Sequence, residues 1–226
     1  MRGGSYTQSP TLHKIDAFPC YNATENICKS RRNYRQPQLP NREEPAMAQL
    51  HAGQTMPDFT YDTPFAQGCQ LSETVRKVPG KTVLVFLRYY GCTLCQYDIH
   101  RYAQAYDQIT AAGGQMLVVL QSDPAKLAAQ MTETDLPFAI VCDPAQTLYR
   151  MLEIRPAANK LGLLNLHTMA KIAKAQKQFV HGDYEGDELQ LPAVFVVDSD
   201  LHLTWAHYGT AVNDVPEPEE LAALLC

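Results

Sequence analysis

The chain of 226 residues contains a single tryptophan, few charged residues and no long apolar run. Charged residues make up 19% of the sequence and the formal net charge is −5, so no basic excess indicates binding to nucleic acid. No uninterrupted apolar stretch approaches the roughly 20 residues that a transmembrane helix needs. The first residues also lack the apolar core of a secretory signal. From these absences we expect a cytoplasmic protein that binds neither nucleic acid nor a membrane.

The cysteines do not follow the pattern of a secreted disulfide framework. There are seven, an odd number, at irregular spacings. Cys92 and Cys95 form the one C-x-x-C motif, and neither a second motif nor a histidine pair at zinc-finger spacing follows. Because a structural zinc site needs four ligands, we predict no metal and no cofactor, and we interpret the motif as a redox pair. No role is predicted for four of the others: Cys20, Cys28, Cys69 and Cys226.

The first 46 residues differ in composition from the rest. They combine arginines and prolines with many Asn, Gln and Ser residues, and they show neither helical nor strand periodicity. We therefore predict a disordered or weakly ordered tail over residues 1–46. Residues 47–226 are enough for one domain with a complete core.

A predicted strand and a predicted helix meet at the C-x-x-C motif. Residues 82–87 are β-branched, aliphatic or aromatic, whereas the apolar residues after Cys92 recur at helical spacing to about residue 112. At the N-terminus of this helix, unpaired N–H groups and the helix dipole favour a thiolate, so the pKa of Cys92 should fall. Cys95, one turn further on, would be the resolving thiol. Arg88 could add positive charge, although its side chain could equally point away.

The following residues alternate between strands and helices. Apolar runs at 115–120 and 137–143 predict two buried strands, each followed by a helix that starts at a capping residue and a proline. Residues 193–197 and 202–206 predict a hairpin, and a short helix closes the chain. This order predicts an α/β fold with a central mixed sheet flanked by helices and with right-handed crossovers.

Residues 156–190 interrupt the alternation and predict a helical insertion before the hairpin. Its lysines are expected on a solvated side. One helical stripe should pack against the domain or a partner subunit: Leu163, Leu166, Met169, Ala170 and Ala173.

Pro192 stands directly before the first strand of the hairpin. A proline at this position fits a rigid turn that can contain a cis bond. Beside a C-x-x-C helix, such a turn would lie close to the sulfurs and leave backbone groups free to pair with an incoming chain.

Three stretches resemble the thioredoxin-fold superfamily, and within it the peroxiredoxin-like proteins of the alkyl hydroperoxide reductase and thiol-specific antioxidant group. They are GQTMPDF at 53–59, FLRYYGCTLC at 86–95 and GDELQLPAVFVVD at 186–198. The R-x-x-G-C-x-x-C form is similar to a redoxin-like branch in which the first cysteine is the nucleophile. The resemblance implies a thioredoxin-like fold, with Cys92 as the reactive position, Cys95 as its partner and Pro192 as a cis-proline that faces them.

The sequence departs from the family at the peroxide pocket. Peroxiredoxins carry Pro-x-x-x-Thr/Ser-x-x-Cys, whose hydroxyl and backbone bind the peroxide, but the positions before Cys92 hold Tyr89 and Val85. The hydroxyl of Tyr89 or Tyr90 could replace the threonine in part. Thiol–disulfide exchange, in contrast, needs only two accessible sulfurs.

The sequence thus predicts an oxidoreductase that cycles Cys92 and Cys95 between dithiol and disulfide. A peroxide or a protein disulfide is the expected substrate, and a thiol such as thioredoxin or glutathione is the expected reductant; a homodimer is compatible with the resemblance. The alternative is a catalytically inactive thioredoxin-fold binding module that uses residues 156–190 as its partner surface. An inert Cys92 would keep a pKa near the free value of about 8.5, which separates the two hypotheses.

Overall fold

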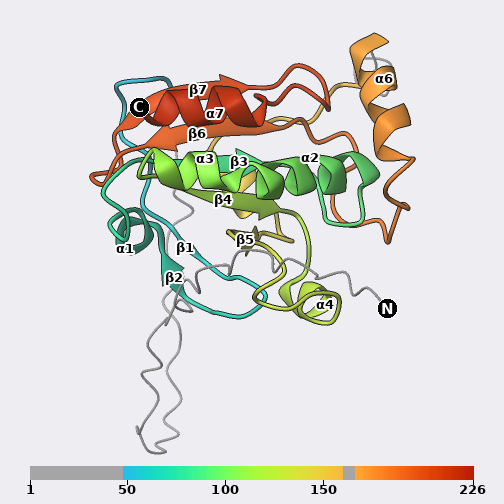
Figure 1. The fold of residues 1–226 in the computed structure, drawn as a ribbon, viewed down its shortest axis with the longest axis horizontal. Coiled ribbons are helices and arrows are strands. Elements are labelled where there is room, and N and C mark those ends of the chain that lie inside the picture. The colour runs from blue at the N-terminus through green and yellow to red at the C-terminus, as the bar shows by residue number, and fades with distance from the viewer. Residues whose placement is uncertain (1–47, 160–165) are drawn as a thin grey trace, which may run out of the picture. The chain divides into compact units, whose positions relative to one another are not determined.

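The computed structural model describes residues 48–159 and 166–226 (Figure 1). The predicted tail, residues 1–46, lies outside the described residues, and so does Leu163 of the predicted stripe. Within the described ranges no helix is long and apolar enough to span a membrane.

A five-stranded mixed sheet forms the centre of the fold, with its strands in the order β5–β4–β3–β6–β7. Along the chain these are β3 (Thr82–Phe86), β4 (Gln115–Leu120), β5 (Ala139–Cys142), β6 (Ala193–Val197) and β7 (Leu203–Tyr208). Strands β3, β4 and β5 are parallel, whereas β6 and β7 are antiparallel additions. Every residue of β3, β4 and β6 is buried, because helices cover both faces of such a sheet. The sheet confirms the predicted α/β class.

Helices α2 (Thr93–Gln104), α3 (Tyr106–Ala111) and α7 (Pro218–Leu225) lie across the face of the sheet that is in front in Figure 1. The single helix predicted up to residue 112 is broken at Ala105, which has φ −102° and ψ 9°. No glycine or proline marks the break, so the periodicity does not reveal it. Gly113, with φ +75°, follows α3 in the left-handed conformation that glycine adopts readily at the end of a helix.

Helix α4 (Pro124–Ala128) starts at the predicted cap, because Asp123 accepts hydrogen bonds from the N–H groups of Ala125 and Lys126. Helix α5 (Thr147–Met151) starts later than the sequence predicts. Asp143 accepts the N–H groups of the first helical residues through its carboxylate, but Gln146, with φ +56°, is the residue at which the chain turns into the helix. The remaining elements are β1 (Thr60–Tyr61), β2 (Cys69–Gln70) and α1 (Leu71–Val75).

Helix α6 (Leu166–Ala175) belongs to the predicted insertion and contacts α2. The insertion begins and ends at one place, because Pro156 and Gln190 form an antiparallel bridge. The predicted packing stripe is wrong: Met169, Ala170 and Ala173 are exposed.

The side of α6 that faces the domain is polar in part. Lys171, expected in solvent, places its Nζ 2.7 Å from Oδ1 of Asp98 on α2, and the Asp98 side chain is buried. Thr168 is buried as well and donates a hydrogen bond to Asn213. Because α6 docks on α2 through an ion pair, its apolar residues do not mark the side that faces the domain.

Candidate active site

Cys92 lies at the N-terminus of α2, as the sequence predicts. Its backbone is extended, and its Sγ accepts the N–H of Cys95 at 3.3 Å. Strand β3 ends at Phe86, and the loop 87–91 carries the chain from the end of the sheet to the first turn of the helix. The Cys92 side chain is 1% exposed, so the sulfur is held inside the protein surface.

Arg88 points towards the sulfur. Its Nη2 lies 2.9 Å from Cys92 Sγ, and its Nη1 donates to the backbone carbonyl of Glu188 at 3.0 Å. Burial alone would lower the pKa of Arg88. The negative charge of the neighbouring Cys95 and Cys92 raises this pKa by a larger amount, so the net shift is upwards. A permanently charged guanidinium therefore stands beside the sulfur.

The two cysteines have different pKa values. The pKa of Cys92 falls to about 6, chiefly through the hydrogen bond from the Cys95 side chain, with burial opposing and Arg88 adding to the effect. Burial raises the pKa of Cys95 well above its usual value, and the neighbouring Cys92 raises it further. At neutral pH this arrangement gives a Cys92 thiolate next to a Cys95 thiol.

Cys95 is 4% exposed and lies in the first turn of α2, and neither cysteine is in a disulfide. Cys142, at the end of β5, is also buried, and burial raises the pKa of its thiol to about 12. The groups that lower the pKa of Cys92 are therefore not shared by Cys142.

Tyr89, which stands at the position of the family's threonine, is buried. Its hydroxyl lies 3.2 Å from Nε2 of His181 and 3.3 Å from Oε1 of Glu188, both of which belong to the insertion. Burial raises the pKa of Tyr89, so its hydroxyl stays protonated. The hydroxyl ties the loop before Cys92 to the insertion.

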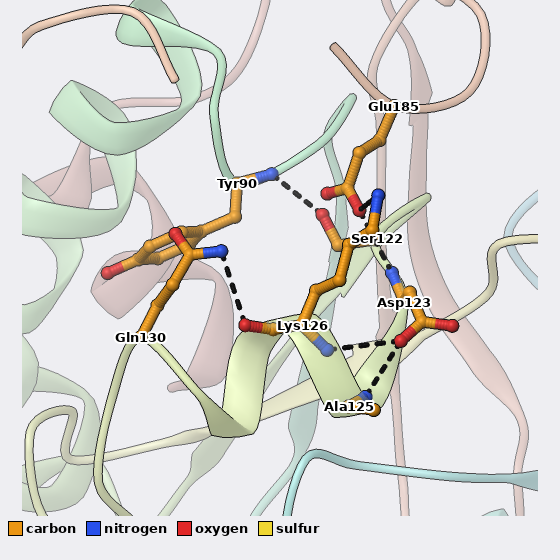
Figure 2. A network of polar contacts seen from close by, with 7 residues as sticks. All are labelled: Tyr90, Ser122, Asp123, Ala125, Lys126, Gln130 and Glu185. Atoms are coloured by element: carbon orange, nitrogen blue, oxygen red, sulfur yellow. Dashed lines mark hydrogen bonds and ion pairs between the residues drawn. The ribbon is translucent and has the colours of Figure 1, made fainter. Parts of the chain in front are cut away.

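Tyr90 is held at its backbone by the end of β4 (Figure 2). Its N–H donates to the hydroxyl of Ser122 at 2.9 Å. In the same network, the N–H of Asp123 donates to Oε1 of Glu185 at 3.4 Å, and Nζ of Lys126 lies 3.5 Å from that oxygen. These contacts fix the insertion to the residues that follow β4, next to the loop 87–91 that carries Tyr90.

Pro192 is not a cis-proline, which corrects the prediction. The peptide bonds of the described residues are all trans, including the bond before Pro192. Phe86 stands opposite Ala193 in the antiparallel ladder, so the register places Pro192 opposite Leu87. Its carbonyl accepts the N–H of Gly209 at 2.9 Å, which continues the ladder to the β7 side. The chain therefore enters β6 already extended, and the ordinary trans preference of proline prevails.

Sequence analysis missed His181 and Glu188 as neighbours of the reactive loop. Both lie in a turn-rich acidic stretch far along the chain from the residues they contact: Glu188 is 100 positions from Arg88, and His181 is 92 positions from Tyr89. No local spacing rule links such segments, and the one signal is that Glu188 falls within the third stretch of the family resemblance. Within the described ranges, no group of three or more His, Cys, Asp or Glu side chains could hold a metal ion.

Solved structures with a similar fold include three peroxiredoxin-type proteins. They are the peroxidoxin BcpB of Mycobacterium tuberculosis (13% identity, TM-score 0.52, 77% of this chain and 96% of that chain), a peroxiredoxin-like protein of Aquifex aeolicus (11%, 0.53, 79% and 87%) and the reduced 2-Cys peroxiredoxin of Plasmodium vivax (11%, 0.53, 76% and 79%). At these identities the likeness shows the fold alone, and it confirms the predicted thioredoxin-like architecture. No curated protein matches the sequence.

The fold places a cysteine at a strand-to-helix junction, and the family model that matches the chain indicates a peroxiredoxin-like oxidoreductase. Residues 52–206 match the family model described as the AhpC/TSA family. The chain belongs to this family, which confirms the resemblance seen in the sequence.

Proposed function

We propose that the chain is a thiol peroxidase in which Cys92 reduces a peroxide and Cys95 resolves the oxidised product. The observation that carries the proposal is the setting of Cys92: a guanidinium nitrogen 2.9 Å and a backbone N–H 3.3 Å from its sulfur, with a protonated thiol one turn away. These groups stabilise a thiolate, which is the nucleophilic form of cysteine.

In the first step, the Cys92 thiolate attacks the nearer oxygen of the peroxide. A sulfur–oxygen bond forms, the oxygen–oxygen bond breaks, and the departing oxygen takes up a proton to leave as an alcohol or water. Cys92 becomes a sulfenic acid and the peroxide is reduced by two electrons. Arg88, whose Nη2 lies 2.9 Å from the Cys92 sulfur, supplies the positive charge that would stabilise negative charge on the leaving oxygen.

In the second step, the Cys95 sulfur attacks the sulfur of the Cys92 sulfenic acid. A disulfide forms, and the hydroxyl leaves with the proton of the Cys95 thiol as water. Residues one helical turn apart have Cβ atoms about 5–6 Å apart, so a local adjustment brings the pair within disulfide reach. A thiol reductant then returns two electrons and restores both thiols.

Stopped-flow oxidation by hydrogen peroxide tests the proposal, with three forms of the protein. The wild type should form the internal disulfide. Cys92→Ser should lose the fast reaction, whereas Cys95→Ser should keep it and stop at a sulfenic acid that a 1,3-diketone probe labels. Alkylation of Cys92 by iodoacetamide should rise with pH around a midpoint of about 6, because the thiolate fraction rises there.

Two results would contradict the proposal. A Cys92 that titrates near the free value of about 8.5 and never bonds to Cys95 would favour the inactive binding module. A slow reaction with peroxide, combined with a fast reduction of protein disulfides, would favour a disulfide reductase.

A further inference from the structure

A segment of the insertion, residues 180–188, lies against the reactive loop; we name it the cover segment. Its Gly182 N–H donates to the carbonyl of Gly91 at 2.8 Å. The Gln96 side chain of α2 donates to the carbonyl of Val180 at 3.2 Å. The backbones touch without an intervening side chain, because a Cβ on Gly91 would lie 2.3 Å from the carbonyl oxygen of Asp183.

The other end of the cover segment is held by the ends of β3 and β4. The N–H of Gln121 donates to the carbonyl of Arg88 at 2.7 Å, so these residues are neighbours. Arg88 Nη1 donates to the Glu188 carbonyl, and Gln121 Oε1 accepts the N–H of Asp187. Gly186 has φ +64°, and a Cβ there would lie 2.0 Å from Gln121 Oε1. Only glycine allows the backbone at position 186 to lie this close to the Gln121 side chain.

The middle of the segment is tied to the loop through Tyr89, whose hydroxyl meets His181 and Glu188. The His181 ring lies 4.3 Å from the ring of Tyr184, centroid to centroid, and both side chains are exposed on their outer side. With the segment in place, Cys92 and Cys95 are both buried. Because it packs on Gly91, Arg88 and Tyr89, directly before Cys92, the cover segment is in a position to close the route to the Cys92 sulfur.

This closure discriminates between the two substrates that the family resemblance leaves open. Exchange with a protein disulfide requires the sulfur of a folded chain, with its flanking backbone, to reach Cys92 Sγ in line. Such an approach meets the backbone of residues 180–188. A small hydroperoxide carries no flanking chain and needs only side-chain movements around Arg88 and Tyr89.

We propose that the cover segment sets the substrate class of this site, admitting small hydroperoxides and excluding the disulfides of folded proteins, and that Gly182 and Gly186 are the residues that determine this specificity. The inference rests on the proposed function, because it assumes that Cys92 is the nucleophile. It adds which oxidant can reach that nucleophile, and it assigns the selection to a segment outside the motif.

The test compares Gly186→Ala with Gly68→Ala. Both glycines have a positive φ, +64° and +67°, so both variants bear a similar backbone strain, but an added Cβ at Gly68 meets nothing within 4 Å. For each protein, two rate constants are measured: oxidation by hydrogen peroxide and reduction of the disulfides of insulin. Gly186→Ala should raise the insulin-to-peroxide ratio by about tenfold or more, because displacing two hydrogen bonds weakens closure by that order. Gly68→Ala should leave the ratio unchanged.

A second variant guards against misfolding of the first. Gly182→Ala puts a Cβ 3.1 Å from Gly91 Cα without a positive φ, and it should raise the ratio in the same direction. If Cys92 reacts with iodoacetamide in every protein but the ratio stays constant in both cover variants, the inference is overturned and the peroxidase proposal stands. If the wild type already reduces insulin as fast as its cover variants do, the inference is also overturned. A Cys92 that is inert in every protein would overturn the proposed function itself.

Discussion

Arg88 contacts both the Cys92 sulfur and the cover segment. Its two terminal nitrogens lie 2.9 Å from Cys92 Sγ and 3.0 Å from the Glu188 carbonyl. The planar guanidinium can hold both acceptors at once, whereas the ammonium of lysine is a compact charge that cannot copy the fork. Charge and geometry at this position can therefore be separated by substitution.

Arg88→Met should raise the pKa of Cys92, because the thiolate loses both a charge partner and a hydrogen bond. The alkylation midpoint should move up from about 6, and the rate at pH 6 should fall about fivefold for the first pKa unit of the change and about tenfold for each further unit. The alkylation midpoint of Arg88→Lys should lie between those of the wild type and Arg88→Met, since lysine keeps the charge. The measurement is the pH dependence of iodoacetamide labelling, with Arg155→Met as a control at an exposed arginine. An unchanged midpoint in Arg88→Met would show that the helix N-terminus and Cys95 suffice.

The local part of the site could be predicted from sequence. The position of Cys92 at a strand-to-helix junction follows from residues that are adjacent in the chain. Its lowered pKa comes chiefly from the nearby Cys95 side chain, and the backbone N–H groups of the first helical turn add to the effect. The direction of Arg88 and the partners of Tyr89 could not be predicted, because the insertion determines them. The cis bond expected at Pro192 is absent: the turn before β6 closes at Gln190, and the chain is already extended at Pro192, whose carbonyl accepts the N–H of Gly209.

Helix α6 is attached to α2 by an ion pair between Lys171 and Asp98, whose carboxylate is buried. Burial raises the pKa of Asp98 to about 6 in spite of the opposing charge of Lys171. A buried pair of this kind is costly to break from one side, since the remaining charge is left without a partner.

Lys171→Met should therefore lower the free energy of unfolding at pH 7.5 by about 3 kcal/mol, and adding Asp98→Leu should recover most of the loss. Denaturation in urea measures both, and Lys174→Met supplies the control at an exposed lysine of the same helix. In the Lys171→Met protein, stability should increase as the pH is lowered towards 5, because the folded state then binds the proton that neutralises Asp98. Equal stabilities of the single and double variants would show that the pair does not hold α6.

The helices were harder to predict than the strands. Strands β3, β4 and β6 are continuous apolar runs, which mark a fully buried strand without help from distant residues. The break at Ala105, the late start of α5 and the docked side of α6 have no such mark, because each depends on tertiary contacts. Periodicity thus locates these helices without fixing their ends or their faces.

The contacts of the domain with the described N-terminal residues begin at Gln49 and Leu50. The Leu50 side chain is buried and its N–H donates to the Tyr208 hydroxyl at 2.8 Å, while Gln49 Nε2 lies 3.5 Å from the Glu153 carbonyl. A folded unit that needs residue 50 is consistent with the start predicted at 47.

A protein that starts at Met47 should accordingly melt at the same temperature as the full chain and keep the reactivity of Cys92. A protein that starts at Met56 should melt lower, because it loses Leu50 and the hydrogen bond from Gly53 to Leu203. Circular dichroism on heating, with thiol labelling at 25 °C, measures both. A large loss of stability in the Met47 form would show that residues 1–46 dock on the domain.

The shared contact of Arg88 has a thermodynamic consequence for the redox cycle. If closure of the cover segment strengthens the Arg88–thiolate pair, the thiolate must strengthen closure by the same factor, because coupling between two equilibria is reciprocal. A disulfide sulfur carries no charge, so the proposed oxidation would remove that contribution and loosen the segment. The reduced protein would then be the form shielded from bulky partners, and the oxidised protein, which needs a reductant, the more open form.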